Sequence, residues 1–393
     1  MALTGFRWHA IIGMMERSLL ASLRRDLARK YVLLTGPRQS GKTTLARKVS
    51  DSHDYVNFDY ADHRTILRDK SWDRSKALLV FDELHKMKGW KAWLKGIFDV
   101  EGIPPGVLVT GSARLDVSRR AGDSLAGRYF LHHLHPFDIK EVAAEVEPAE
   151  ACERLLSFGG FPEPFLEASE SFYRRWRKTH LDIILRQDLL DLETVRDLTG
   201  VETLIEMLRT RVGSPVSYAS LARDLQRDPK TVKRWLEILE SLYVIFPVRP
   251  YHRNVARTIL KEPRYYFFDI AQGRDEAGSR LENLVATALL KEVDRLADEG
   301  LPPARLHYLK TRDGKEIDFA LFSEGSPPIL IEVKSSDDEP ARWFGAFERF
   351  FPNARKIQLV KDLRREKTYP DGLEVRRLVP WLAGIDLSRL FPA

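Results

Sequence analysis

Hydrophobic residues in the first third of the chain form short unbroken runs between charged segments. The runs cover residues 31–34, 77–81 and 107–109, and the segment 55–59 also has the character of a strand. Residues 16–30 instead carry leucines at helical spacing, with arginines between them. Because unbroken apolar runs are typical of parallel strands buried on both faces, this part of the chain predicts an α/β domain with a parallel sheet.

The middle of the chain changes to helical periodicity. The glycine- and proline-rich stretch 158–165 predicts a loop near the end of the first domain. Apolar residues then recur at helical spacing over 172–185, 216–225 and 230–239. The pair Asp228-Pro229 supplies an N-cap and a first helical residue between the last two segments, so we expect a helix-turn-helix there. The run 243–248 would be the first strand of a wing.

The C-terminal part is predicted to combine a helix over 279–290 with strands over 307–310, 316–321 and 329–334. The pair Asp313-Gly314 favours a tight hairpin between the first two of these strands. We therefore expect three domains. An α/β domain would cover residues 1–155, a helical and winged-helix segment 156–250, and a second α/β domain 251–393.

A phosphate-binding motif follows the first apolar run. Two glycines separated by four residues precede a lysine and a threonine, between a predicted strand and a predicted helix. Glycine allows the backbone to approach an anion closely, so that N–H groups and the start of the next helix face the phosphates of ATP. The residues expected at the nucleotide are Gly36, Pro37, Arg38, Gln39, Ser40, Gly41, Lys42, Thr43 and Thr44. Lys42 would reach the terminal phosphates, and Thr43 would bind Mg²⁺.

Acidic and hydroxyl side chains end the next two apolar runs. Asp82 is expected to hold the Mg²⁺ shell opposite Thr43, and Glu83 to orient or deprotonate the attacking water. After the run 107–109, Thr110 or Ser112 would sense the γ-phosphate, although a plain strand-ending turn explains them equally well.

Other polar residues of this domain carry weaker signals. Arg114 and Arg128 are candidates for the charge that stabilises phosphoryl transfer, in cis or from a neighbouring copy in a homo-oligomer, but a surface ion pair explains each of them alone. The three histidines at 132, 133 and 135 lack the carboxylate pattern of a metal site.

Basic residues in the middle segment suggest DNA contact. The second helix of the helix-turn-helix would expose Lys230, Lys233 and Arg234, as a recognition helix does. Such folds also serve as packing modules, so this interpretation stays open. Aromatic residues between 172 and 176 alternate with arginines, a pattern that is better explained by a buried aromatic face and a solvated basic one.

Four charged residues in the C-terminal domain have the spacing of a metal-dependent nuclease site. Glu282 lies on the predicted helix, Asp318 on one strand, and Glu332 and Lys334 on the next. Converging carboxylates can hold Mg²⁺ against a phosphodiester, and a lysine can position water. The pattern resembles the restriction-endonuclease-like superfamily, although Ile317 stands where that family often has proline. The alternative is an ion-pair cluster on an inactive copy of the fold.

Taken in order, these parts resemble a bacterial and archaeal family of P-loop ATPases with an AAA-type core, a winged helix and a C-terminal domain of unknown function, of the DUF4143 type, with a nuclease-like fold. The resemblance covers nearly the whole chain. It is carried by the phosphate loop, Asp82-Glu83, the glycines at 159 and 160, the helix-turn-helix and the C-terminal charged set. It implies ATP binding with Mg²⁺.

Composition limits the remaining choices. The chain has 393 residues, a formal net charge of +6 and one cysteine, so a disulfide framework within the chain is excluded. We expect a cytoplasmic protein without a signal peptide or membrane span. The combined features predict an ATP-hydrolysing protein that remodels or processes duplex or branched DNA. The alternative is an ATP-controlled switch or assembly protein in signalling or defence, with the C-terminal domain as an interaction surface.

Overall fold

The computed structural model describes residues 15, 17–111, 125–188, 197–252, 262–273, 277–336 and 339–391. The chain divides into two compact units. The first unit contains the chain up to Pro136 together with Ser241–Tyr243, and the second contains Phe137–Glu240 and Val244 onward. The three domains expected from the sequence divide the chain differently, and their boundaries stay a prediction. No helix within the described residues has both the length and the apolar character to cross a bilayer.

The first unit is built on a parallel five-stranded sheet. The strands are β1 (Tyr31–Thr35), β2 (His53–Asn57), β3 (Leu78–Asp82), β4 (Gly106–Gly111) and β5 (Tyr129–His133), and their order is β2-β3-β4-β1-β5. The helices are α2 (Leu20–Leu27), α3 (Lys42–Lys48), α4 (Ala61–Asp69) and α5 (Trp90–Glu101), with a short 3₁₀ turn at Leu84–Lys86. The α/β class predicted from the apolar runs is confirmed.

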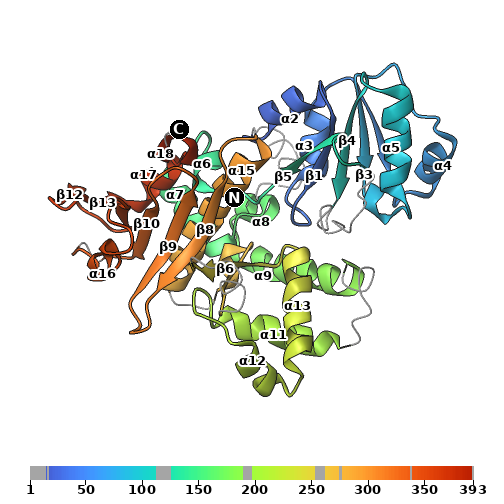
Figure 1. Cartoon of the computed structure of the whole chain (residues 1–393). Helices are drawn as coiled ribbons and strands as arrows, with labels where there is room; N and C mark the ends of the chain where they lie inside the picture. The colour runs from blue at the N-terminus through green and yellow to red at the C-terminus, as the bar shows by residue number, and fades with distance from the viewer. Residues whose placement is uncertain are drawn as a thin grey trace. The chain divides into compact units, whose positions relative to one another are not determined.

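Both faces of this sheet are buried, which explains its unbroken apolar strands. Side chains alternate along each strand, so Leu33 and Phe81 enter one core while Val32 and Val80 enter the other. Residues of α5 complete the first core, and residues of α2 and α3 complete the second. Figure 1 shows α5 on one face of the sheet and α2 and α3 on the opposite face. The carboxyl ends of the parallel strands therefore lie on one edge, where a ligand site is expected.

The second unit combines helices with a mixed eight-stranded sheet. The helices are α6 (Ile139–Val142), α7 (Pro148–Phe158), α8 (Pro162–Glu167), α9 (Glu170–Ile183), α11 (Leu198–Arg209), α12 (Tyr218–Leu225), α13 (Pro229–Ser241), α15 (Ala277–Asp298), α16 (Phe344–Glu348), α17 (Leu378–Ala383) and α18 (Leu387–Leu390). The strands are β6 (Ile245–Pro250), β7 (Arg264–Phe267), β8 (Ala304–Lys310), β9 (Glu316–Ser323), β10 (Ile329–Lys334), β11 (Arg355–Val360), β12 (Lys367–Thr368) and β13 (Leu373–Arg377). Single turns, a π turn at Ile184–Asp188 and a 3₁₀ turn at Ile270–Gln272, follow α9 and β7.

The strand order in this sheet is β12-β13-β11-β10-β9-β8-β6-β7. Strand β6 pairs antiparallel with β7, as in a wing, and parallel with β8. The expected wing strand is therefore part of the C-terminal sheet. One sheet spans the boundary near residue 250 that the sequence suggested.

The predicted helix-turn-helix is confirmed as α12 and α13. Asp228 caps α13 as expected, because its Oδ1 accepts the backbone N–H of Lys230 at 2.8 Å. Helix α13 begins at Pro229 and buries Val232, Trp235 and Leu236 along with other apolar residues of one face. This local chemistry explains why the element could be predicted from the sequence.

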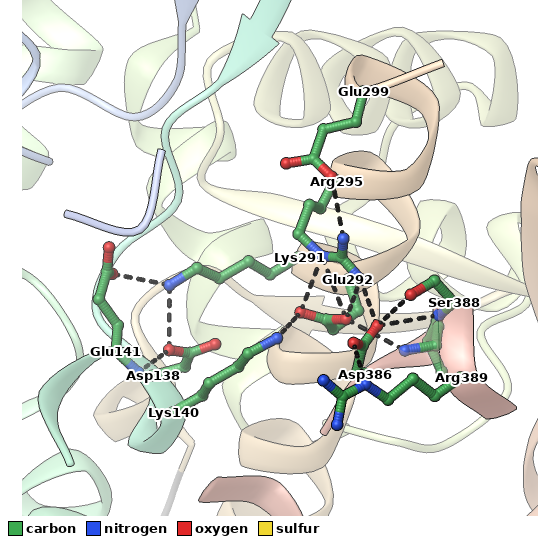
Figure 2. Close-up of polar contacts among 11 residues, drawn as sticks. Asp138, Lys140, Glu141, Lys291, Glu292, Arg295, Glu299, Asp386, Ser388 and Arg389 are labelled. Atoms are coloured by element: carbon green, nitrogen blue, oxygen red, sulfur yellow. Dashed lines mark hydrogen bonds and ion pairs between the residues drawn. The ribbon is translucent and has the colours of Figure 1, made fainter. Parts of the chain in front are cut away.

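A polar network joins α6 and α18 to the long helix α15 (Figure 2). Lys291 lies 3.0 Å from Asp138 and 2.8 Å from Glu141. The buried carboxylate of Glu292 accepts from Lys140 at 2.7 Å and from Arg295 at 2.9 Å. Burial alone would raise the pKa of Glu292, but these hydrogen bonds outweigh it and hold that pKa below its usual value. Because the buried charges are paired, the network holds the three helices together within the second unit.

Candidate nucleotide site and C-terminal carboxylate cluster

The phosphate loop connects β1 to α3 in a conformation that depends on glycine. Gly36 has φ +149°, and a Cβ placed on it would lie 2.3 Å from the carbonyl oxygen of Leu134. Gly41, immediately before α3, is left-handed with φ 96°. Because side-chain-bearing residues rarely adopt these angles and Gly36 has no room for a methyl group, both glycines are required for the loop shape.

Lys42 folds back over this loop. Its Nζ donates to the carbonyl oxygen of Gly36 at 2.9 Å and to that of Pro37 at 2.6 Å. The side chain is buried, with 7% of the residue exposed, so its charge is held at the loop and away from bulk water. A cation placed in this way is available to phosphate oxygens that enter the loop.

Asp82, at the end of β3, lies beside Thr43. The Thr43 hydroxyl donates to Asp82 Oδ2 at 2.9 Å, as the sequence prediction of a shared site requires. Tyr55 donates to the same oxygen at 2.5 Å, and the Thr110 hydroxyl donates to Oδ1. Burial, followed by the bond to Asp82, raises the pKa of Tyr55 to about 12. These donors fix the carboxylate, so Asp82 is held in one orientation.

A role of Thr110 at the γ-phosphate stays a prediction. Its hydroxyl is directed to Asp82, so its observed contact positions that carboxylate. The backbone oxygen of Thr110 also accepts the N–H of Glu83 at 3.1 Å, which places the second acid of the pair next to the first. Ser112 and Arg114 lie outside the described residues.

Glu83 adopts a left-handed backbone with φ 56°, which is uncommon for a residue with a side chain. Its Oε2 lies 3.4 Å from Lys86 Nζ and 3.8 Å from His85 Nε2. Burial lowers the pKa of Lys86, but the hydrogen bond to Asp59 and the charge of Glu83 more than offset it and raise that pKa overall. Strained backbone at an acid beside a ligand site is a common feature of functional positions.

Arg128 does not lie near the phosphate loop of its own chain. It precedes β5, in which Tyr129 pairs with Tyr31 and His133 pairs with Thr35, so it stands at the opposite end of the strands from the loop. From Arg128 to His133, the residue that pairs with Thr35, the strand spans about 16 Å at about 3.3 Å per residue. Its guanidinium instead pairs with Asp99 at 2.6 and 3.2 Å. The prediction of an arginine finger in cis is corrected to a surface ion pair, and a role in a neighbouring copy stays a prediction.

The loop fits the triphosphate that its motif implies. The Ser40 hydroxyl oxygen is buried and has no hydrogen-bond partner among the described residues. A buried hydroxyl without a partner is rare, and a phosphate oxygen is a suitable acceptor for it. Together with Lys42 and the glycine backbone, this orphan donor matches the chemistry of a nucleotide site.

One of the three neighbouring histidines of this unit is paired with an acid. His132 is fully buried, and its Nε2 lies 2.9 Å from Asp26 Oδ2. No group of three or more histidine, cysteine or acidic residues within the described parts of the chain is arranged to hold a metal ion.

In the second unit, the four predicted C-terminal residues do come together. Asp318 Oδ2 accepts the backbone N–H of Val333 at 3.0 Å, and its own N–H donates to Glu332 Oε2 at 3.4 Å. Lys334 Nζ lies 2.8 Å from Glu332 Oε1. Glu282, from α15, joins them through a residue that the sequence analysis did not identify.

That residue is Arg264, at the start of β7. Its guanidinium lies 3.4 Å from Glu282 and 3.6 Å from Asp318, and it also binds Glu316. Only 3% of Arg264 is exposed. Tyr266 adds a hydrogen bond to Glu282 Oε1 at 2.5 Å. The cluster therefore already contains a buried cation.

Burial also moves these carboxyl groups toward their neutral forms. It raises the pKa of Glu282 to about 8 and that of Glu332 to about 7, and the charge of Asp318 adds to both shifts. The pKa of Asp318 is likewise raised by burial. A Mg²⁺ site needs ionised oxygens that face an open position. The observed cluster does not fit that requirement as it stands, since Arg264 already pairs with Glu282, Asp318 and Glu316, and catalysis by Glu332 and Lys334 stays an untested prediction.

The basic residues of the middle segment lie as expected. Lys230, Lys233 and Arg234 are exposed on α13. Lys233 Nζ lies 3.7 Å from Glu237 on the next turn of the helix. In α9, Tyr173 and Trp176 are buried while Arg174, Arg175 and Lys178 are exposed, which confirms the interpretation of an aromatic core face and a solvated basic face.

Comparison with known proteins agrees with this organisation. Family models match an AAA domain over residues 28–143, a domain of unknown function, DUF8612, over 149–299, and another, DUF4143, over 277–380. Protein Rv2008c of Mycobacterium tuberculosis is 31% identical over 324 residues, which cover 79% of this chain and 72% of that protein. The chain belongs to this AAA–DUF4143 family. As the sequence predicted, its first unit is a P-loop ATPase domain of the AAA type.

More distant similarities cover different shares of the chain. The alignment of this AAA–DUF4143 protein with MJ1544 of Methanocaldococcus jannaschii is 408 positions long at 23% identity and covers 91% of this chain and 90% of that protein. A signal-transduction ATPase with numerous domains from Pyrococcus horikoshii is 16% identical, covers 71% of this chain and 46% of that chain, and has a TM-score of 0.23. PCH-2 of C. elegans is 14% identical, covers 59% and 71%, and has a TM-score of 0.25. At such TM-scores neither structure informs the function.

Proposed function

We propose that this AAA–DUF4143 protein hydrolyses ATP at the phosphate loop and uses the resulting cycle to act on duplex or branched DNA. The ATPase part of the proposal rests on the 2.9 Å hydrogen bond from the Thr43 hydroxyl to the carboxylate of Asp82. Thr43 directly follows Lys42 in the sequence. A hydroxyl and a carboxylate at this separation supply the oxygen ligands that Mg²⁺ prefers.

Each residue of the site has a proposed role. The backbone N–H groups of residues 36 and 38–41, with the side chains of Arg38, Gln39, Ser40 and Thr44 around them, would surround the phosphates. Lys42 would exchange its bonds to two loop carbonyls for bonds to the terminal phosphates. When bound with ATP at Thr43 and Asp82, Mg²⁺ would neutralise phosphate charge during transfer.

Glu83 is the proposed partner of the attacking water. It adjoins Asp82, and the backbone bond to Thr110 holds it at the same edge of the sheet. Its Oε2 lies 3.4 Å from Lys86 Nζ, and a carboxylate in this position is a group that can accept a proton or orient water. Thr110 would act on the reaction only through Asp82.

DNA contact is proposed for the exposed face of α13. Lys230, Lys233 and Arg234 lie on the second helix of the helix-turn-helix, the helix that enters the major groove in proteins of this architecture. Cleavage is not part of the proposal, because the buried Arg264 already pairs with Glu282 and Asp318. The same observation favours a second candidate, an ATP-controlled switch whose C-terminal part is an interaction surface.

The first experiment tests ATP turnover. The rate is measured with Mg²⁺ for the wild type, Lys42→Ala and Asp82→Asn, with Lys91→Ala on α5 as a matched lysine control. We expect the two site variants to lose on the order of a hundredfold in kcat, because each removes a group aimed at the transferring phosphates or their metal. Wild-type turnover that does not need Lys42 would refute the site.

The second experiment separates DNA action from a switch. ATPase rate and DNA affinity are measured with single-stranded, duplex and four-way DNA, for the wild type and for a variant with Lys230, Lys233 and Arg234 changed to Ala. Its matched control changes Arg174, Arg175 and Lys178, which are equal in charge and exposed on α9. We expect only the α13 variant to lose stimulation by DNA. Its binding should also depend less steeply on salt, with a slope smaller by about 0.9 for each phosphate that is no longer neutralised.

Two results would reject DNA action. One is an ATPase rate that no DNA form changes, and the other is an equal effect in the α9 control, which would indicate unspecific charge attraction. An ATP-dependent change of oligomeric state, measured by light scattering, together with DNA-insensitive turnover would establish the switch instead.

A further inference from the structure

A buried arginine outside the phosphate-binding motif contacts the phosphate loop. Arg17 precedes α2, and only 7% of it is exposed. Its Nη1 donates to the backbone oxygen of Ser40 at 2.8 Å, and its Nη2 donates to the backbone oxygen of His135. One guanidinium therefore joins the loop to the segment that follows β5.

The segment that Arg17 joins to the loop also contacts the loop directly, at Gly36 and Thr35. The carbonyl oxygen of Leu134 lies against the α-carbon of Gly36, and the N–H of Leu134 donates to the backbone oxygen of Thr35 at 2.8 Å. Residues 134 and 135 therefore pack against the loop, and Arg17 links the backbone of Ser40 to the backbone of His135. Burying a guanidinium costs free energy unless its N–H groups form hydrogen bonds. The two backbone carbonyls therefore fix the position of the guanidinium, and the guanidinium fixes theirs.

We propose that Arg17 is a positioning residue for nucleotide binding. A loop that turns its N–H groups toward phosphates must turn carbonyl oxygens away from them, and those oxygens need donors of their own. Arg17 supplies the donor for Ser40. Lys42 holds other loop carbonyls only until it moves to the phosphates, whereas the bond from Arg17 to Ser40 does not have to break when ATP binds.

The chain contains a matched control for this inference. Arg24, on α2, also donates to two backbone carbonyls, those of Val49 at 2.9 Å and Lys48 at 3.1 Å. These carbonyls lie at the far end of α3 from the phosphate loop. Replacing Arg24 therefore removes the same kind of bond from the same unit without touching the loop.

The test measures the dissociation constants of ATP and ADP, the steady-state kcat and KM, and the melting temperature for Arg17→Ala, Arg17→Lys and Arg24→Ala. We expect Arg17→Ala to weaken nucleotide binding about ten- to a hundredfold, the range for removing a charge-assisted hydrogen bond. Arg17→Lys should give an intermediate effect, because an ammonium lacks the planar fork that reaches both carbonyls. Arg24→Ala should leave affinity within about twofold of the wild type, whatever its melting temperature.

The inference rests on the proposed nucleotide site, and the outcomes distinguish the two. A folded wild type that binds no ATP would overturn the proposed function. A wild type that binds ATP, with Arg17→Ala equally competent, would overturn the role of Arg17, as would an equal decrease in affinity in Arg24→Ala. If Arg17→Ala does not fold, Arg17→Lys decides, and unchanged affinity in that variant would count against the inference.

Discussion

Replacing Arg264 by Met would test whether the C-terminal charges are an ion-pair cluster. Met keeps much of the length and volume of the side chain but removes its charge. The change leaves Glu282, Glu316 and Asp318 without the cation that lies within 3.6 Å of Asp318 and 3.4 Å of Glu282. Of these carboxylates, Glu282 and Asp318 are the more buried, with 20% and 18% of the side chain exposed.

The expected cost follows from the burial of the partners left behind. Removing one member of a buried charge cluster costs about 3–5 kcal/mol, because the remaining charges stay desolvated. This cost is smaller at a pH at which the carboxyl groups left without Arg264 are protonated, because a neutral carboxyl group is less costly to bury than a charged one. We therefore expect the free energy of unfolding to fall by about 3 kcal/mol or more above about pH 8 and by less at lower pH.

The direction of this pH dependence follows from the raised pKa values. Burial raises the pKa of Glu282 to about 8 in the folded protein, well above its value in an unfolded chain. Such a group favours folding fully below its unfolded pKa, and that contribution is lost as pH rises through the folded value. Without Arg264, whose charge lowers the pKa of Glu282, the folded pKa moves higher still. Below about pH 8 Glu282 holds its proton in both folded proteins, so this part of the deficit of the variant grows only as pH rises above about 8.

Hydrogen exchange of the amides in β9 and β10 measures the stability of this region directly, because both strands carry the cluster. Arg209→Met is the matched control, since Arg209 is buried to a similar degree but donates to the neutral side chain of Gln272 and to the exposed carboxylate of Glu206, which water can solvate when the arginine is removed. A variant of Arg264 as stable as the wild type above about pH 8, or one whose deficit has the same pH dependence as that of Arg209→Met, would contradict the ion-pair interpretation.

Three further changes test other parts of the structure. Gly36→Ala should lower ATPase activity on the order of a hundredfold, because its Cβ would lie 2.3 Å from a backbone oxygen, while Gly96→Ala, with nothing within 4 Å, should be silent. Gly159→Ala should cost about 2 kcal/mol or more of unfolding free energy in urea, because its Cβ would lie 2.0 Å from Asp269 Oδ1; added Asp269→Ala should recover part of it, and no recovery would refute the clash. Tyr243→Phe should cost about 1 kcal/mol of unfolding free energy by removing the hydroxyl bonded to Thr35, and a double-mutant cycle with Thr35→Val that shows no coupling would refute that cause.

The first unit was largely predictable from the sequence because its signals are local. The glycines of the phosphate loop, the apolar runs of β1, β3 and β4, and the acid that ends β3 all lie within short segments whose geometry follows from residue type. The meeting of Thr43 with Asp82 also followed, since the carboxyl ends of parallel strands share one edge. The cap of α13 by Asp228 was predictable for the same reason.

The rest depends on pairing between distant segments, which periodicity does not reveal. Arg264 meets Glu316 only because β7, β6, β8 and β9 are neighbours in one sheet, and nothing near Arg264 in the sequence indicates those acids. Arg128 is the residue type that an arginine finger requires, but the register of β5 against β1 places it at the end of the strand that is far from the phosphate loop. Arg17 lies outside every motif, and only the fold shows that its guanidinium ends at the loop.

The assignment of Ser241–Tyr243 to the first compact unit has a consequence for biosynthesis. The Tyr243 hydroxyl lies 2.9 Å from Thr35 Oγ1, at the end of the strand that leads into the phosphate loop. During translation, the ribosome must therefore complete Phe137–Glu240 before the last piece of the N-terminal unit exists. A fragment that stops at Pro136 would lack this tyrosine, so the end of β1 that leads into the phosphate loop gains this contact only after α13 has been made.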